Sequence, residues 1–337
     1  MTVVVTGASG HIGGNLVRAL LDRGRPVRAL VHQDRRALQG LQAEIVQGDV
    51  RDPASLRHAF KGAQVVYHTA AHVSIATDEW PLLHAINVVG TRNVVEACLH
   101  CGVRRLIHFS SIHALQQEPL DAPVDESRPL AEAIDDAPYD RSKAAAEQEV
   151  RRGIAQGLDA VVLNPTAILG PHDYRPSHMG QVLLALGSGQ LPALVPGGFD
   201  WVDVRDVVKG AMRAEERAPG GARYILSGHW ASVRDLAAMV ESITGVRAPW
   251  LVCPLFLAYL GVPLATATAC LSGQRPLFTR VALDTLQGNR QIRHARAAGE
   301  LGYHPRPLQE TLVDSLRWFA EAGLLARPLA RRTVGAL

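Results

Sequence analysis

Short apolar runs alternate with longer amphipathic stretches through the first 170 residues of the chain. Parallel strands need a helical crossover between them, so this alternation indicates a parallel sheet with helices on both faces. Strands that are covered on both faces read as continuous apolar runs. The predicted strands are Val3–Val5, Val27–Val31, Glu44–Val46, Val65–His68, Leu106–Phe109 and Val161–Leu163. We therefore expect an α/β protein with a doubly wound parallel sheet.

The charge balance favours a small-molecule partner over a nucleic acid. Lysine and arginine number 35 against 32 acidic residues in 337, and their even spread leaves no basic footprint for a nucleic acid. Four cysteines are too few for a disulfide framework, and no signal peptide precedes the first strand, so we expect a cytoplasmic protein. Cys98 and Cys101 lie in one predicted helix without a second ligand pair, so we assign them to packing and predict no metal.

A glycine-rich turn follows the first strand and opens a predicted helix. Glycines at 7, 10 and 13 suit a tight turn, the approach of a pyrophosphate and the packing of helix on strand, in that order. The helix N-terminus adds amide donors and positive potential. We therefore predict a Rossmann-type dinucleotide site. Its residues in this turn are Gly7, Ser9, Gly10, His11, Ile12 and Gly13.

The end of the second strand bears on the choice of dinucleotide. A carboxylate there would bind the ribose 2′-hydroxyl of NAD, but this strand ends at His32. Arg35 and Arg36 follow, and a guanidinium group can hold the 2′-phosphate of NADP. The alternative is two solvated arginines, with Asp34 beside them. We predict NADP(H) as the favoured cofactor, with NAD(H) as the alternative.

Two segments after the third and fourth strands are compatible with the same dinucleotide. Asp49, which Val50 follows, can accept a hydrogen bond from the adenine amino group. Thr69, Ala70 and Ala71 are small enough to admit the cofactor backbone.

A tyrosine and a lysine lie four residues apart at the start of an alanine-rich predicted helix, so Tyr139 and Lys143 share one face. A nearby ammonium is expected to lower the pKa of a phenol and to make it a practical acid or base. Ser111 ends the fifth strand at the carboxyl edge of the sheet, where it can hydrogen-bond a reacting oxygen. Ser110 is the weaker candidate, and His72 and His113 follow strands nearby.

The order of these parts resembles the extended short-chain dehydrogenases/reductases over residues 1 to about 325. The matching segments are Thr6–Gly13, Gly48–Val50, Asn87–Thr91, Phe109–Ser111, Tyr139–Lys143, Asn164–Pro171 and Trp201–Val207. Asn164–Thr166 and Arg35–Leu38 look most like the branch of dihydroflavonol reductases and 3β-hydroxysteroid dehydrogenases, which interconverts ketones and secondary alcohols.

This resemblance implies roles for particular residues. Ser111, Tyr139 and Lys143 would form the catalytic trio, and Lys143 would also hold the nicotinamide ribose. Pro165 and Ile168 would lie near the nicotinamide, with Ser110 close by, and Asn87 would support the cofactor site. One departure is His32, where that branch commonly has arginine, so a preference for NADP rests on Arg35 or Arg36.

The later part of the chain predicts a second lobe. Proline and glycine become frequent after Pro171, Arg223–Leu226 reads as a strand that returns to the main sheet, and Ser232–Asp235 reads as a capping box. We expect residues 1–170 and 201–227 to form the dinucleotide-binding domain. Residues 171–200 and 228–325 would form a smaller, mainly helical substrate lobe, and residues 326–337 a loose tail.

Residues 249–274 contain no charged side chain. Prolines and a glycine interrupt this stretch, which argues against a membrane span. Two alternatives stay open, namely a lining for a hydrophobic substrate and a surface that rests on a membrane or on a partner subunit.

The leading functional hypothesis is an oxidoreductase that interconverts a ketone and a secondary alcohol on a small, apolar substrate, with Tyr139 as acid or base. The main alternative is a nucleotide-sugar epimerase or dehydratase with tightly bound NAD. Dehydratases of the family carry Asp-Glu where this chain has Ile112 and His113, which counts against dehydration. A binding protein without turnover would not need Tyr139. The family resemblance also implies a homodimer through residues 82–99 and 143–154.

Overall fold

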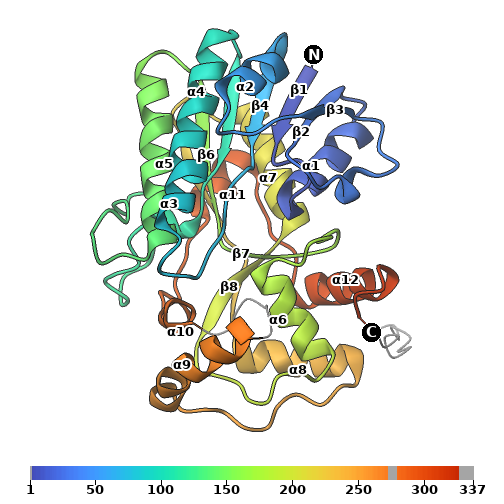
Figure 1. Ribbon diagram of the computed structural model, residues 1–337, viewed down its shortest axis with the longest axis vertical. Coiled ribbons are helices and arrows are strands. Elements are labelled where there is room, and N and C mark those ends of the chain that lie inside the picture. The colour runs from blue at the N-terminus through green and yellow to red at the C-terminus, as the bar shows by residue number, and fades with distance from the viewer. Residues whose placement is uncertain (1, 272–278, 326–337) are drawn as a thin grey trace.

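The larger lobe is built on a seven-stranded parallel sheet (Figure 1). The computed structural model describes residues 2–271 and 279–325. The sheet has the order β3-β2-β1-β4-β5-β6-β9. Its strands are β1 (Thr2–Thr6), β2 (Val27–Val31), β3 (Glu44–Gln47), β4 (Ala63–His68), β5 (Arg105–Phe109), β6 (Ala160–Pro165) and β9 (Arg223–Leu226). All the predicted strands are present, and the Rossmann-type fold class is confirmed.

Helices cover both faces of this sheet, which is why its strands are apolar on both sides. Val3 and Val5 of β1 pack into one buried cluster, and Val4 between them packs into the cluster on the opposite face. One face carries α1 (His11–Asp22), α7 (Val204–Arg217) and α11 (Ala295–Leu301). The other carries α2 (Pro53–Phe60), α4 (Gly90–His100) and α5 (Pro138–Ala155). Cys98 is fully buried in the second cluster, as its predicted packing role requires.

The strand order reverses beside β1, because the chain crosses from β3 at one side of the sheet to β4 at the other side of β1. In open α/β sheets, ligands bind outside the carboxyl ends of the strands at such a switch point. The carboxyl ends of β1, β4, β5 and β6 all point toward the second lobe, and the short helix α3 (Trp80–Leu83) follows β4 on the same side (Figure 1). The fold thus defines one edge at which to look for a site.

The smaller lobe combines a three-stranded sheet with helices. Strand β8 (Gly198–Asp203) pairs with both β7 (Ala167–Leu169) and β10 (His229–Ser232). The helices of this lobe are α6 (His178–Gly187), α8 (Val233–Thr244), α9 (Leu255–Leu271), α10 (Arg280–Leu286) and α12 (Leu308–Glu321). The capping box of Ser232 and Asp235 at the start of α8 is confirmed.

The two lobes are interleaved in sequence as expected, since β9 returns to the large sheet after β8. The proposed domain boundaries stay a prediction. Those boundaries group β7 and the second half of β8, Trp201–Asp203, with the large lobe, whereas both strands hydrogen-bond within the small sheet. The predicted loose tail, residues 326–337, lies outside the described residues. Within the described part of the chain, no helix is both long and apolar enough to cross a membrane.

Candidate active site

The glycine turn between β1 and α1 is shaped by close backbone contacts. Gly7 has φ +66°, and a Cβ there would lie 2.6 Å from the amide nitrogen of Ala70. A Cβ on Gly13 would lie 2.2 Å from the carbonyl oxygen of Gly7. A Cβ on Gly10 would meet only that same oxygen, at 3.3 Å, and no side chain caps α1. The first amides of α1 are therefore available to an anion, and the turn fits a pyrophosphate.

The other predicted residues of this turn differ in their contacts. Ser9 and Ile12 are half-buried beside the glycines. The His11 ring points elsewhere, since its Nε2 donates to the carbonyl oxygen of Pro171 at 3.1 Å. Asn15 Nδ2 donates to the same oxygen at 3.0 Å. The His11 side chain thus anchors the crossing to the small lobe, and only its backbone amide remains for a cofactor.

Arg35 and Arg36, which follow β2, differ in their partners. Arg36 Nη2 lies 2.6 Å from Asp34 Oδ2, and this hydrogen bond lowers the pKa of Asp34. Arg35 is exposed, and among the described residues no carboxylate pairs with it. His32 is also exposed, with Nε2 3.4 Å from Asp49 Oδ2. Arg35 is therefore the side chain best placed to meet a 2′-phosphate without giving up an existing partner.

The segments after β3 and β4 lie beside the end of β2 and the glycine turn. The Asp49 carboxylate is held by Arg51 at 2.6 Å, which lowers the pKa of Asp49. Val50 is buried. Thr69 Oγ1 donates to the carbonyl oxygen of Thr6 at 2.7 Å and so ties β4 to β1, while Ala70 lies against Gly7 and Ala71 is exposed.

Ser111, Tyr139 and Lys143 gather at the carboxyl end of β5. Ser111 is buried, and its Oγ accepts a hydrogen bond from the His113 amide at 3.2 Å. Tyr139 and Lys143 lie one turn apart on α5, and Ser111 hydrogen-bonds the Tyr139 phenol. Lys143 is 3% exposed, and its Nζ donates to the carbonyl oxygen of Phe109 at 2.8 Å. The sequence predicted this grouping.

The electrostatics of the trio correct one expectation. Burial raises the pKa of Tyr139 above its ordinary value, and only the hydrogen bond with Ser111 acts in the opposite direction. Lys143 does not lower the pKa of the phenol, because its ammonium is directed at the Phe109 carbonyl. Burial also lowers the pKa of Lys143 to about 8. At neutral pH the site therefore holds a protonated phenol, which is poised to give a proton.

Asn87 joins the loop after β4 to the catalytic helix. It lies in a π-helical turn, His84–Val89, of the kind that is frequent at functional sites. Its Nδ2 donates to Ser142 Oγ and to the carbonyl oxygen of His72, both at 2.9 Å, and its Oδ1 accepts from the His72 amide at 2.7 Å. Ser142 Oγ in turn donates to the Tyr139 carbonyl oxygen at 2.7 Å. Asn87 therefore fixes the backbone on which Tyr139 is carried.

A second buried network was missed as part of the site. Asn164 Nδ2 donates to the carbonyl oxygen of Ser111 at 2.8 Å and to Glu147 Oε1 at 2.6 Å. Glu147 is fully buried and also pairs with Arg223 of β9. The available signal was the spacing of Glu147, one turn beyond Lys143 on the buried face of α5. These residues hold the end of β5 against the catalytic helix.

Two buried polar atoms at this edge, Ser110 Oγ and Asn164 Oδ1, have no hydrogen-bond partner among the described residues. Ser110 is 6% exposed, and its Oγ makes no hydrogen bond in the structure. Buried polar atoms normally have a hydrogen-bond partner. A ligand group beside the end of β5 would supply the partner that Ser110 Oγ lacks. Pro165 is buried at the end of β6 and Ile168 half-buried in β7. With the open glycine turn, this arrangement fits a dinucleotide whose nicotinamide end lies near Ser110.

Two histidines line the same region and already have acidic partners. His72 Nε2 lies 2.8 Å from Glu79 Oε2. His113 Nδ1 lies 3.6 Å from Asp140 Oδ1, and its ring centroid is 6.1 Å from that of Tyr139. Burial opposes the charged form, but the Asp140 carboxylate raises the pKa of His113 above its ordinary value. His113 can therefore carry a positive charge more readily than an ordinary histidine, and it lies beside the Tyr139 ring.

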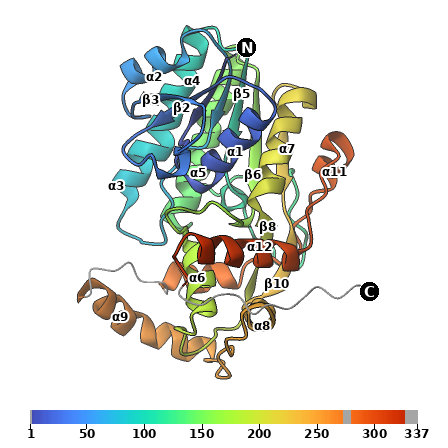
Figure 2. The ribbon, with the colours of Figure 1, turned by 90° about the vertical axis from the view of Figure 1, so that its right-hand side faces the viewer.

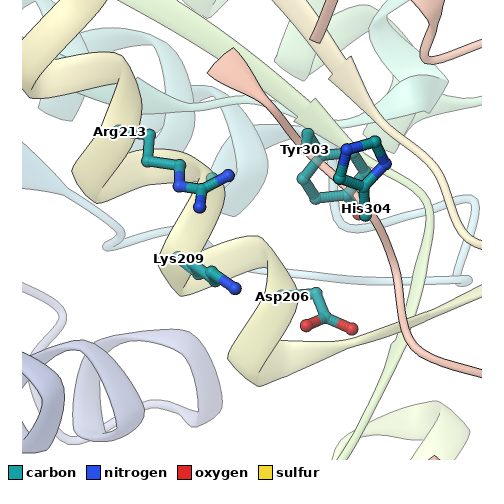
Figure 3. Close-up of a pocket in the computed structure, with 6 residues that line it drawn as sticks. Asp206, Lys209, Arg213, Tyr303 and His304 are labelled. Atoms are coloured by element: carbon teal, nitrogen blue, oxygen red, sulfur yellow. The ribbon is translucent and has the colours of Figure 1, made fainter. Parts of the chain in front are cut away.

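A small crevice lies on the opposite face of the sheet, along α7 (Figure 3). Its volume is about 10 Å³, enough for about one water molecule. Its side chains are engaged already, since Tyr303 donates to Ser227 and Asp206 pairs with Arg306. This crevice brings together none of the predicted site residues. Within residues 2–271 and 279–325, no cluster of three or more His, Cys, Asp or Glu side chains could hold a metal.

Comparisons with known proteins agree with this geometry. The model of the NAD dependent epimerase/dehydratase family matches residues 3–226. Sterol demethylase protein B of Methylococcus capsulatus is 37% identical, with 96% of this chain and 100% of that protein covered. A Stigmatella aurantiaca enzyme, 4-hydroxy-2-methyl-3-oxo-4-farnesyl-3,4-dihydroquinoline-1-oxide ketoreductase, is 31% identical over 97% and 99% of the two chains.

Among solved structures, the crystal structure of gox2253 superposes with a TM-score of 0.84 at 35% identity, covering 96% of this chain and 99% of that one. Relatives named for dihydroflavonol reduction and for 3β-hydroxysteroid dehydrogenation are also similar, which confirms the branch that the sequence resembled. The chain therefore belongs to the NAD-dependent epimerase/dehydratase family and is an oxidoreductase of the extended short-chain dehydrogenase/reductase type.

Proposed function

We propose that the protein reduces a ketone to a secondary alcohol on an apolar substrate, with NADPH as the reductant. The observation that carries this proposal is the grouping of Ser111, Tyr139 and Lys143 at the carboxyl end of β5. The Tyr139 phenol, whose pKa is raised, keeps its proton at neutral pH and suits the acid role that carbonyl reduction needs. Oxidation of an alcohol would instead need a phenolate at the start of the cycle.

Ser111, Tyr139 and Lys143 have different roles in the proposed reduction. A bound reduced dinucleotide supplies the hydride that adds to the carbonyl carbon. Ser111 orients the carbonyl oxygen through its hydroxyl, and Tyr139 gives its phenolic proton to that oxygen as the carbon–oxygen π pair moves onto it. The Ser111 hydroxyl stabilises the phenolate that remains, since it is the group that lowers the pKa of Tyr139. The Lys143 ammonium holds the Phe109 carbonyl beside Ser111, and the Asn87 and Asn164 networks keep the trio in place.

The choice of NADPH within an NAD-dependent family rests on Arg35. Its guanidinium group is exposed and has no acidic partner in the described part of the chain. No carboxylate occupies the end of β2, where an NAD-selective protein would place one. A 2′-phosphate would therefore gain a charge-assisted bond and meet no repulsion from the strand end.

The substrate class follows from the small lobe and from the relatives. Residues 249–274 are uncharged, and the lobe core is apolar around Trp201 and Phe319. Two relatives are named for a sterol and for a farnesylated quinoline, both isoprenoid-derived. We therefore assign an isoprenoid-derived ketone as the substrate class, and His113 as a side chain that would favour a polar group near the reacting carbonyl.

The proposal also includes a homodimer and a cytoplasmic location. A homodimer would form through α4 and α5, where Leu82 of the adjoining α3 is 38% exposed and Ala145 of α5 is only half-buried. Light scattering of the purified protein tests this, with a mass near twice 36.3 kDa expected. A cytoplasmic location agrees with the free thiols of Cys98 and Cys101.

The first experiment is to denature freshly purified protein and to identify any released nucleotide by mass spectrometry. Little bound nucleotide, reversible NADPH binding and turnover of an apolar ketone panel are expected. Near-stoichiometric NAD carried through purification, with no ketone reduced, would instead point to the epimerase-like alternative, because such an enzyme regenerates its cofactor in each cycle.

A further inference from the structure

The first part of helix α9, residues 255–263, is apolar on all sides, yet only one side of it is covered. Leu255, Ala258, Tyr259 and Val262 follow helical spacing and pack on the cluster of Val195 and Leu283. The opposite side carries Phe256 and Leu260, which are 64% and 73% exposed, and Leu257, which is also exposed. A helix that is hydrophobic all round is normally buried. The outer side of α9 therefore lacks the occupant that its residues require.

The segment before α9 continues the same exposed surface. Trp250 is 91% exposed, and Leu251 and Val252 beside it are also exposed. The backbone here is held in place, because the Leu194 amide donates to the Leu251 carbonyl oxygen at 2.9 Å and the Cys253 amide donates to the Leu194 carbonyl oxygen at 2.8 Å. The exposure is therefore a fixed feature of the fold. We call Trp250, Leu251, Val252, Phe256, Leu257 and Leu260 the outer α9 surface.

The charges around this surface select its occupant. Between Glu241 and Asp284 the sequence carries no acidic residue, and the described arginines there are Arg247 and Arg280. A two-fold dimer would place the same patch against itself, which would bring arginines together without a carboxylate from this segment. An anionic lipid surface complements both the arginines and the apolar side chains. An exposed tryptophan is also the side chain that is most typical of the membrane–water interface.

A cavity lies directly behind the surface. It measures about 480 Å³ and is lined by Tyr259, Val262 and Pro263 of α9 with Arg280 and Asp284 of α10. Tyr259 donates to Asp284, and the Arg280 guanidinium lies 5.9 Å from the centre of the Tyr259 ring. Such a volume falls in the range of small-molecule sites. The cavity therefore adjoins an apolar exterior on one side.

A hydrogen bond links the start of α10, which lines this cavity, to the loop after β4. Helix α10 starts after Thr279, whose Oγ1 donates to the carbonyl oxygen of Ile75 at 3.0 Å. Ile75 lies in the loop after β4 that Asn87 clamps to the catalytic helix. In Figure 2, α9 projects at the end of the molecule remote from the large sheet, and α10 lies between them in Figure 1.

We propose that the outer α9 surface docks the protein on an anionic membrane in the interfacial plane, and that the cavity between α9 and α10 receives a substrate dissolved in that membrane. The docking itself is independent of the reaction, whereas the delivery of a lipid-soluble ketone rests on the proposed function. The surface binds without spanning the bilayer, since apolar side chains and flanking arginines together suffice for interfacial attachment.

The test is flotation of the full-length protein with vesicles of phosphatidylcholine, with and without phosphatidylglycerol. The wild type is expected to float with the mixed vesicles and to bind more weakly in high salt. The triple variant Trp250→Ser, Phe256→Ser, Leu260→Ser should bind at least roughly tenfold more weakly, because three large apolar side chains no longer enter the interface. Ile134→Ser is the matched control, since Ile134 is 76% exposed but lies outside the surface.

Three results would overturn the docking proposal. The first is a wild-type protein that stays in the soluble fraction with both vesicle types, and the second is a triple variant that floats as well as the wild type. The third is a triple variant that changes from dimer to monomer by light scattering, which would make this surface a subunit interface. Reduction of a water-soluble ketone should be equal in wild type and triple variant, so a failure of docking stays distinguishable from a failure of the proposed reaction.

Discussion

Two regions of the molecule depart from ordinary protein architecture in opposite ways. One is the edge of the large sheet where Ser111, Tyr139 and Lys143 lie, and the other is the outer α9 surface. At the edge, polar groups such as Lys143, Glu147 and Asn164 are buried and hydrogen-bonded to one another or to the backbone. On α9, large apolar side chains are exposed on a backbone that is held in place. Burying polar groups costs stability unless they are paired, and exposing apolar groups is unfavourable unless something covers them. We therefore infer that each departure marks a place where the protein meets another molecule.

The largest expected effect separates the edge from the surface. Tyr139→Phe should lower turnover by about 10²- to 10⁴-fold, because the ring remains and only the proton is lost. Dinucleotide binding, measured by NADPH fluorescence, should stay within a few-fold of wild type, and vesicle binding should not change. If the variant kept its activity, the assignment of Tyr139 as the acid would be wrong.

The two arginines after β2 provide a matched pair. Arg35→Ala should raise the Kd for NADPH by roughly 10- to 100-fold, because a charge-assisted bond to the 2′-phosphate is lost. Arg36→Ala should have a much smaller effect, since Arg36 is paired with Asp34 at 2.6 Å. Titration of both variants with NADPH and with NADH is the measurement. Equal effects of the two substitutions, or none on NADPH, would contradict the role given to Arg35.

A stability comparison sharpens the contrast between buried polar and exposed apolar residues. Glu147→Gln removes a charge that is buried against Arg223 and Asn164, and we expect it to lower the free energy of unfolding by about 2 kcal/mol. Leu260→Ser, at a side chain that is 73% exposed, should change it by less than about 0.5 kcal/mol. Urea denaturation measures both, and the opposite ranking would show that the outer α9 surface is covered in the isolated protein.

The smallest expected effect is a dependence on pH that has opposite signs for activity and stability. The pKa of Lys143 is lowered to about 8 from its ordinary 10.5, so turnover should fall as pH rises through about 8 and the ammonium that holds the Phe109 carbonyl beside Ser111 is lost. Between these two values the unfolded chain holds a proton that the folded chain has released, so this group favours folding as pH rises. Pre-steady-state rates and thermal unfolding from pH 7 to about 10 test both signs. A rate that still rises past pH 9 would exclude a requirement for the charged form of Lys143.

Much of the fold and of the trio was predictable because local patterns determine them. Strands covered on both faces must be apolar throughout, and Tyr139 and Lys143 share a helix face through their spacing alone. The network of Asn164, Glu147 and Arg223 was not predictable, because it joins β6, α5 and β9 across up to 76 positions of sequence. The pKa expectation for Tyr139 failed for the same reason, since the direction of the Lys143 ammonium depends on a carbonyl 34 residues away.

Composition alone could not predict which side of α9 is exposed. The uncharged stretch from residue 249 to 274 left a pocket lining and an exposed surface equally open. In the described part of α9, Tyr259 and Val262 line the pocket beside α10, and Phe256, Leu257 and Leu260 on the other side are exposed. Which side is which depends on the packing against Val195 and Leu283, a tertiary contact that no periodicity of a uniformly apolar helix can reveal.

The central claim is net reduction of a ketone, and transfer of a labelled hydride tests it most directly. Protein supplied with NADPH deuterated at C4 and with a panel of isoprenoid-derived ketones should yield an alcohol with one deuterium at the carbinol carbon, together with one equivalent of NADP. Tyr139→Phe is the control and should yield almost none. Bound NAD that is neither consumed nor exchanged, with no deuterium in any product, would contradict the account and favour an epimerase that restores its cofactor in each cycle.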